Sequence, residues 1–229
     1  MKKLMIACLF LAAVSSQGQG NTILDRLGTA GTGSSLFMNK VLDKSAENIT
    51  GTPYLNDVFM LSEISGAANS FLTRYNAYKD EVEVSYEKET FVIPKDDRFE
   101  MIYNITSNYK LKLVKYTSDT NQSVYGYLIE LFGNDKVGVY RRERTLLRPS
   151  RESNNSYAPR IAAYYDKVSP DYFLQLDENK IIPFPKNKKA LLNLYPSKKD
   201  ALSDYLKVNK TSFKNEADLV SLTKFLATL

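Results

Sequence analysis

The chain has 229 residues and contains no histidine, no tryptophan and a single cysteine. The missing histidine excludes Ser-His-Asp and Cys-His catalysis, His-ligated zinc and imidazole acid–base chemistry. The formal charge of +5 is too small to indicate a nucleic-acid partner.

The N-terminus, residues 1–19, has the pattern of a signal peptide. Lys2 and Lys3 form the basic region, Leu4–Val14 the apolar core, and small or polar residues follow. The apolar core is too short to span a bilayer. Cys8 lies inside this core, so the mature chain is expected to contain no cysteine. We expect an exported protein of the periplasm, the outer membrane surface or the extracellular space; a buried N-terminal helix and a lipoprotein are the alternatives.

Three further segments are expected after the signal peptide. Residues 20–50 are rich in Gly, Thr and Ser, which indicates a flexible segment with at most a short helix over 35–48. Residues 51–185 have the period-two alternation of antiparallel strands. Residues 186–229 have helical spacing and are expected to pack on the strands. The predicted fold is therefore α+β, with a mainly antiparallel sheet (meander, sandwich or open barrel) followed by a short α-helical C-terminal segment.

The clearest strand signal is a β-hairpin within residues 71–92. Phe71, Thr73 and Tyr75 share one face, and Lys79-Asp80 is a plausible turn before a return strand over 82–86. More strands are expected at 57–64, 91–93, 99–105, 110–113, 125–131 and from Val137 onward, and at 160–168, 172–176 and 181–182. Residues 160–176 are interpreted as another hairpin, turned by Ser169-Pro170-Asp171.

Helix starts are expected at two polar residues of the C-terminal segment. Ser197 is a candidate N-cap for a helix through Leu202 and Leu206. Asn215 is a candidate N-cap for the last helix, which carries an apolar stripe of Leu219, Leu222, Phe225 and Leu226.

Several stretches carry a resemblance to a known group of proteins. They are GTPYLNDVF at 51–59, TRYNAYKDEVEV at 73–84, and the tail over 187–229. Together they resemble a family of uncharacterised exported proteins of Bacteroidota-type bacteria, for which no activity is established. The resemblance implies an exported bacterial protein and brings no catalytic residue to this chain.

The sharpest charge feature is a run of five arginines at positions 141, 142, 144, 148 and 151. On a strand, Arg142, Arg144 and Arg148 share one face, which predicts a surface for phosphate or carboxylate groups of an anionic glycan, lipopolysaccharide or an envelope protein. The alternative is a solvated strand end. Tyr125 and Tyr127, two of 16 tyrosines, are predicted as further ligand-binding residues, because a groove lined by tyrosines stacks on sugars or peptides. The alternative is that strand propensity alone explains the tyrosines.

Carboxylates are the groups that would support hydrolysis. Glu81 and Glu83 share a strand face, roughly 7 Å apart at the backbone, and paired carboxylates at such separations hydrolyse glycosides. The competing interpretation is the solvated face of a sheet. Gly133-Asn134-Asp135 and Lys95-Asp96-Asp97 are interpreted as ordinary turns because they lack the acidic ligands of a calcium loop. No cofactor and no metal are expected.

These observations favour an exported, non-enzymatic binding or envelope-associated protein. No transmembrane span is expected after signal removal, and no oligomeric state is predicted. A carboxylate-based glycan hydrolase is one alternative. A structural subunit of an envelope complex is another, and an exposed apolar stripe on the last helix would favour it.

Overall fold

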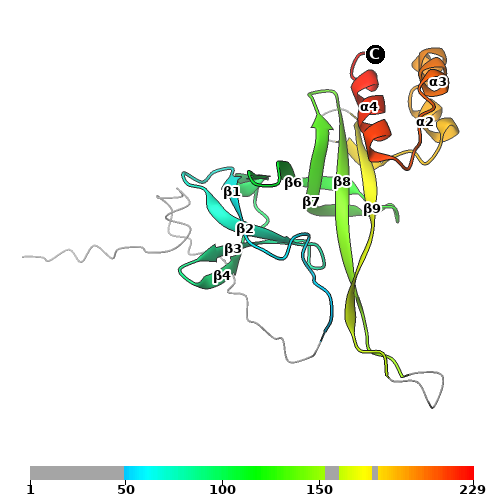
Figure 1. The fold of residues 1–229 in the computed structure, drawn as a ribbon. Coiled ribbons are helices and arrows are strands. Elements are labelled where there is room, and N and C mark those ends of the chain that lie inside the picture. Colours follow the sequence, from blue (N-terminus) through cyan, green and yellow to red (C-terminus); the bar gives the residue numbers. More distant parts are fainter. Residues whose placement is uncertain (1–48, 153–159, 177–179) are drawn as a thin grey trace, which may run out of the picture.

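The computed structural model describes residues 49–152, 160–176 and 180–229. The predicted signal peptide and the short helix expected over 35–48 lie outside these ranges. The described chain forms a ten-stranded antiparallel sheet with three α-helices toward the C-terminus (Figure 1). The predicted α+β class with mainly antiparallel strands is therefore confirmed. Within the described residues, no helix combines the length and apolar character needed to cross a membrane.

The elements follow one another along the chain as strands, then helices. They are β1 (Met60–Ile64), β2 (Phe71–Asn76), β3 (Glu81–Tyr86), β4 (Glu89–Val92), a 3₁₀ turn (Asp97–Phe99), β5 (Met101–Asn104), β6 (Tyr109–Thr117), β7 (Ser123–Gly133), β8 (Val137–Arg148), β9 (Tyr164–Leu176), β10 (Lys180–Pro183), α2 (Lys188–Leu194), a 3₁₀ turn (Pro196–Lys198), α3 (Lys199–Val208) and α4 (Glu216–Leu226).

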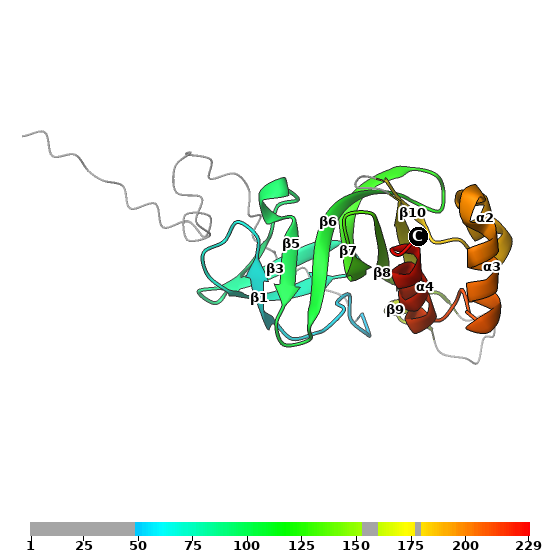
Figure 2. The ribbon, with the colours of Figure 1, turned by 90° about the horizontal axis from the view of Figure 1, so that it is seen from above.

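The strand order is β10-β9-β8-β7-β6-β5-β1-β2-β3-β4. Consecutive strands are neighbours throughout the sheet, with one exception. Strand β5 pairs with the edge of β1 that β2 leaves free, and not with β4. At the other end, β10 comes into contact with β6 although neither strand pairs with the other. Strands β6–β10 therefore curl around an interior of their own, beside the β1–β5 part (Figure 2).

The predicted hairpin is present as β2 and β3. The side chains of Phe71, Tyr75, Val82 and Val84 are buried in one cluster, as the alternation requires. Asp80 in the turn has a φ of 57°, a left-handed conformation that Asp adopts more readily than most residues.

Three apolar clusters cover both faces of the central strands. The first lies between β1–β4 and the facing side of β6 and β7, and Phe99 and Ile102 are among its members. The second fills the curl of β6–β10 and is built around Tyr140 and Phe173. The third lies between β7–β9 and the three helices. Successive side chains of β7 and β8 point into different clusters, so both faces of these two strands are covered.

The hairpin predicted within residues 160–176 is wrong. Ser169-Pro170-Asp171 lies inside one continuous strand, β9, which pairs with β8 along almost its whole length. The register shifts between Arg142 and Arg144, which face Asp171 and Val168. This β-bulge leaves the intervening residues outside the regular ladder, and a proline, which has no N–H to donate, is tolerated there.

The helices pack on the sheet through one apolar face. Asn215 caps α4 as predicted, because its side chain accepts a hydrogen bond from Asp218 N. Ser197 is not a cap: it lies in a 3₁₀ turn, and Lys198 precedes α3 without a side-chain cap. The stripe on α4 is covered, since Leu219 and Leu222 are fully buried and Phe225 stacks on Tyr205 with ring centroids 4.2 Å apart.

Candidate functional site

The three predicted arginines lie on β8 and each pairs with a carboxylate of β9. Arg142 donates to Asp171 from Nη2 at 2.5 Å, and Arg144 lies 2.9 Å from the same carboxylate. Arg148 lies 2.9 Å from Asp166. The structure thus brings Arg142 and Arg144 together on one acid and places Arg148 further along the strand.

Arg142 differs from the other two because its side chain packs against buried aromatic rings. Its guanidinium lies 5.8 Å from the Tyr116 ring centroid and 5.4 Å from that of Phe173. Its side chain is only 16% exposed, against 40% for Arg144 and 47% for Arg148. Hydrogen bonds from the guanidinium to Asp171 and to the Tyr116 hydroxyl raise the pKa of Arg142, although its burial acts in the opposite direction.

The two predicted tyrosines lie on β7, away from these ion pairs. Tyr127 is 1% exposed and belongs to the first apolar cluster. The hydroxyl of Tyr125 donates to Asp97 Oδ1 at 2.7 Å, and burial together with that carboxylate raises the pKa of Tyr125 to about 12. In the described part of the chain, neither tyrosine forms a hydrogen bond or ring contact with the three arginines.

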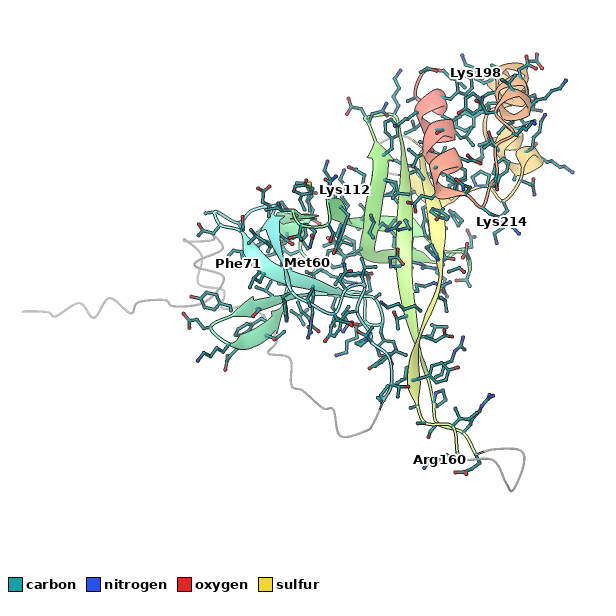
Figure 3. The ribbon with its side chains drawn as sticks, in the orientation of Figure 1. Met60, Phe71, Lys112, Arg160, Lys198 and Lys214 are labelled. Carbon is teal, nitrogen blue, oxygen red and sulfur yellow. The ribbon has the colours of Figure 1, made fainter. Side chains whose placement is uncertain are left out.

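Beyond the bulge, β8 and β9 leave the body of the sheet as a two-stranded ribbon (Figure 1). We call residues 144–152 and 160–168 the β8–β9 arm. Arg160 lies near its tip, as Figure 3 shows. The arm has five cationic and two anionic side chains, a net charge of +3: Arg144, Arg148, Arg151, Arg160 and Lys167 against Glu152 and Asp166. The chain as a whole has +5, so positive charge is concentrated here.

The arm also has exposed apolar and aromatic side chains. Ile161 and Tyr164 are each 39% exposed. Tyr164 faces Arg148 directly across the ribbon, so a ring and a guanidinium share one surface. Thr50 N donates to Ala163 O and Thr50 O accepts from Tyr165 N, so residue 50 is bound to the outer edge of the arm about midway along its length.

The carboxylate pair proposed for hydrolysis does not form an open site. The expectation that Glu81 and Glu83 lie on the solvated face is wrong for Glu83, which is 1% exposed. Glu83 Oε2 accepts from Arg74 Nε at 2.8 Å, and Oε1 accepts from the Tyr54 hydroxyl at 3.3 Å. Segment 54–59 covers this face: the Arg74 guanidinium lies 3.7 Å from the Tyr54 ring centroid and 4.4 Å from that of Phe59.

A polar hub at Asp80 was not predicted. Its carboxylate accepts from the Tyr75 hydroxyl at 2.8 Å, from Tyr127 N at 3.1 Å and from Lys95 Nζ at 2.5 Å. The carboxylate thereby provides an acceptor for the N–H of Tyr127, which has no partner on β8 because the pairing of β7 with β8 starts at Ile129. A Cβ on Gly126 would collide with this carboxylate. A glycine within a strand pattern signals such a close approach, and this was the available sequence signal.

Replacing Asp80 by alanine is expected to destabilise the protein by about 1–3 kcal/mol for each buried donor that is left without an acceptor. The donors are the hydroxyl of Tyr75, which is 2% exposed, and the N–H of Tyr127. Thermal and urea unfolding measure the loss. Asp80→Asn is the matched control, because asparagine keeps an acceptor oxygen and tolerates the left-handed backbone. Equal losses of stability in both variants would contradict the explanation by donors left without an acceptor.

The two polar turns are accounted for by local hydrogen bonds. Asn134 Oδ1 accepts from the backbone N–H groups of Lys136 and Val137. Asp96 caps the turn at Arg98 N, and the Arg98 guanidinium holds the pKa of Asp96 below its usual value. Across the described ranges, no three Asp, Glu, Cys or His side chains are grouped so as to hold a metal ion.

No family model, no curated protein and no solved structure matches the chain. The resemblance to exported bacterial proteins therefore stays a prediction.

Proposed function

We propose that the protein is an exported, non-enzymatic binding protein that holds an anionic glycan on its β8–β9 arm. The observation that carries this proposal is the net charge of +3 on a ribbon whose end extends beyond the body of the sheet. The ligand groups would be phosphates or carboxylates attached to sugars, since planar guanidinium groups pair with both.

The state of the ion pairs supports this assignment. Arg148 and Asp166 are 47% and 36% exposed, and Arg160 and Glu152 are 64% and 84% exposed at 3.5 Å. Exposed pairs of this kind contribute about 0–1 kcal/mol. A ligand anion therefore displaces the protein carboxylate at small cost, and a glycan with several anionic groups adds the contributions of several such contacts.

The alternatives have less support. The hydrolase hypothesis depended on Glu81 and Glu83, and Glu83 is buried against Arg74. The subunit hypothesis depended on an exposed stripe at Leu219, Leu222 and Phe225, which the fold covers. Export itself is proposed from the signal-peptide pattern of residues 1–19 and from the resemblance described above.

Reversing the charge of Arg148, Arg151 and Arg160 together is expected to weaken binding to an anionic glycan about tenfold or more, because up to three charge-assisted contacts are lost. All three side chains are exposed, so the variant is expected to keep its melting temperature. Arg142 is left unchanged because its reversal would disturb Asp171 and the apolar interior. Calorimetry with purified lipopolysaccharide and with lipid-free polygalacturonate measures binding and separates the two sources of anionic sugar.

The matched control reverses three exposed lysines of the helices: Lys188, Lys189 and Lys199. The net charge changes equally, and acidic residues in first helical turns cost no stability. We expect this variant to bind like the native protein. If both triple variants lose the same affinity, the attraction is a property of net charge and not of the arm; if neither loses affinity, the proposal fails.

A further inference from the structure

A cavity of about 460 Å³ lies between the curled strands β6–β10 and residues 65, 100 and 101 of the β1–β5 part. All five strands and the β7–β8 turn contribute to its lining. Its volume is within the range of about 300–1,000 Å³ that is typical of small-molecule sites. It is distinct from the β8–β9 arm, because none of the arm residues lines it.

The cavity has polar groups held in fixed positions. Gln175 is only 9% exposed, and its Oε1 accepts a hydrogen bond of 2.6 Å from the hydroxyl of Tyr140. Burial and the nearby charge of Glu130 raise the pKa of Tyr140, so this hydroxyl stays protonated and keeps donating. Among the described residues, the amide nitrogen of Gln175 has no hydrogen-bond acceptor, although its residue lines the cavity.

A carboxylate and an ammonium group complete the polar wall. Glu130 is 12% exposed and pairs with Lys112 Nζ at 2.5 Å. Lys112 projects from β6 near the junction of the two parts of the sheet (Figure 3). Val114 and Ile181 supply an apolar side. The wall thus has a donor amide, an ammonium, an acceptor carboxylate and a hydrocarbon surface.

Two glycines make room for these groups. Gly133 and Gly138 face each other across β7 and β8. A Cβ at Gly138 would lie 3.0 Å from Gln175 Oε1, and a Cβ at Gly133 would lie 3.0 Å from Glu130 Oε2. Any larger residue would therefore press on the polar groups that line the cavity. Neither glycine has a positive φ, so the backbone conformation does not itself require them.

We propose that this cavity binds a neutral polyhydroxylated molecule of the size of one or two sugar units. A hydroxyl group both donates and accepts, and the wall offers donors and an acceptor side by side. Glu100 and Asp135 also line the cavity. Lys112 and Lys110 both pair with Glu130, so three carboxylates stand against two ammonium groups, which disfavours anionic ligands. The apolar side at Val114 and Ile181 fits the C–H face of such a ligand.

The test is a titration of the ¹⁵N-labelled protein with glucose, N-acetylglucosamine and maltose, followed by NMR. We expect at least one of these sugars to shift the side-chain amide of Gln175 and the backbone signals of Gly133 and Gly138, with a dissociation constant of about 0.1–10 mM. Putrescine and gluconate serve as cationic and anionic comparators. Shifts with putrescine or gluconate alone, or no shift at these residues with any sugar, would overturn the proposal.

Two variants test the contacts. Gln175→Glu keeps an acceptor for Tyr140 and removes the amide donor, and Glu130→Gln removes the charged acceptor. Each is expected to weaken sugar binding about tenfold, because one hydrogen-bonding group of the wall is lost. Gln122→Glu, on an exposed turn, makes the same chemical change outside the cavity and is expected to bind normally. The triple arm variant is also expected to bind neutral sugars normally, so failure of one proposal leaves the other testable.

Discussion

Replacing Arg74 by methionine is expected to lower the free energy of unfolding by about 3–5 kcal/mol, because the substitution leaves the charge of Glu83 buried without a partner. Glu83 is 1% exposed, and Arg74 is 20% exposed. Urea unfolding followed by circular dichroism at neutral pH measures the loss. Methionine fills much of the volume of the arginine stem, so the electrostatic effect dominates the result.

The remaining neighbours of Glu83 cannot replace the arginine. The Tyr54 hydroxyl donates at 3.3 Å, and Asn76 Nδ2 approaches Oε1 at 3.5 Å. Both groups are neutral and their contacts are long. Arg74 also holds Tyr54 in place, since Nη2 donates to the Tyr54 hydroxyl at 2.7 Å. The substitution therefore also loosens segment 54–59, which covers this face.

Two further variants test whether the unpaired charge of Glu83 causes the loss of stability. The double variant Arg74→Met/Glu83→Leu removes both charges and is expected to recover most of the lost stability, as apolar replacements of buried pairs often do. Arg148→Met breaks the exposed pair with Asp166 and is expected to cost less than about 1 kcal/mol. The idea fails if the single Arg74 variant is no less stable than the Arg148 variant.

Elements specified by nearby residues were predicted well. The alternation of Phe71, Thr73 and Tyr75 depends only on the two-residue period of a strand, and β2 has this register. The Asn215 cap depends on a hydrogen bond to a residue three positions away. In both cases the decisive contact lies within a few residues of sequence, so a pattern is enough to find it.

Elements specified by distant partners were predicted poorly. Ser169-Pro170-Asp171 has the composition of a turn, yet β8 pairs with β9 on both sides of it and absorbs the extra residues in a bulge. The alternation of Glu81 and Glu83 indicates a solvated face, but segment 54–59 returns to cover Glu83. Neither partner leaves a signal in the local sequence, because both effects arise from tertiary packing.

The candidate sites divide in the same way. The basic run at Arg142, Arg144 and Arg148 is visible in the sequence, although the partners Asp166 and Asp171 are not. The cavity was missed because Lys112, Glu130 and Gln175 come from three strands and meet only when β6–β10 curl. A glycine at position 133 and another at 138 were the only local hints, and glycines near a turn have a simpler explanation.

The protein is expected to lose stability steeply as the pH rises from 10 to 12, because several tyrosines must stay protonated in the folded state. Burial, together with the charge of Glu83, raises the pKa of Tyr54 to about 12. Burial raises the pKa of Tyr125 to about 12, and the pKa values of Tyr127 and Tyr140 further still. The ordinary value for tyrosine is about 10.

The sign follows from proton binding. Above pH 10 the unfolded chain releases tyrosine protons that the folded chain still holds, so the free energy of unfolding decreases with pH. The contribution is fully present below pH 10 and is lost as the pH rises through the folded pKa values. Urea midpoints between pH 8 and 11.5 measure the slope, and tyrosinate absorbance in native and urea-unfolded protein measures the two titrations separately.

Tyr54→Phe is the variant to compare, because it removes one tyrosine hydroxyl whose pKa is raised in the folded protein. It also removes the hydrogen bonds to Arg74 and Glu83, so its stability at pH 8 is expected to be lower than that of the native protein. The informative quantity is the slope above pH 10, which becomes shallower because one fewer proton separates the two states. Coincident tyrosinate titrations in native and unfolded protein would contradict the expectation, since they would mean that burial does not hold these protons.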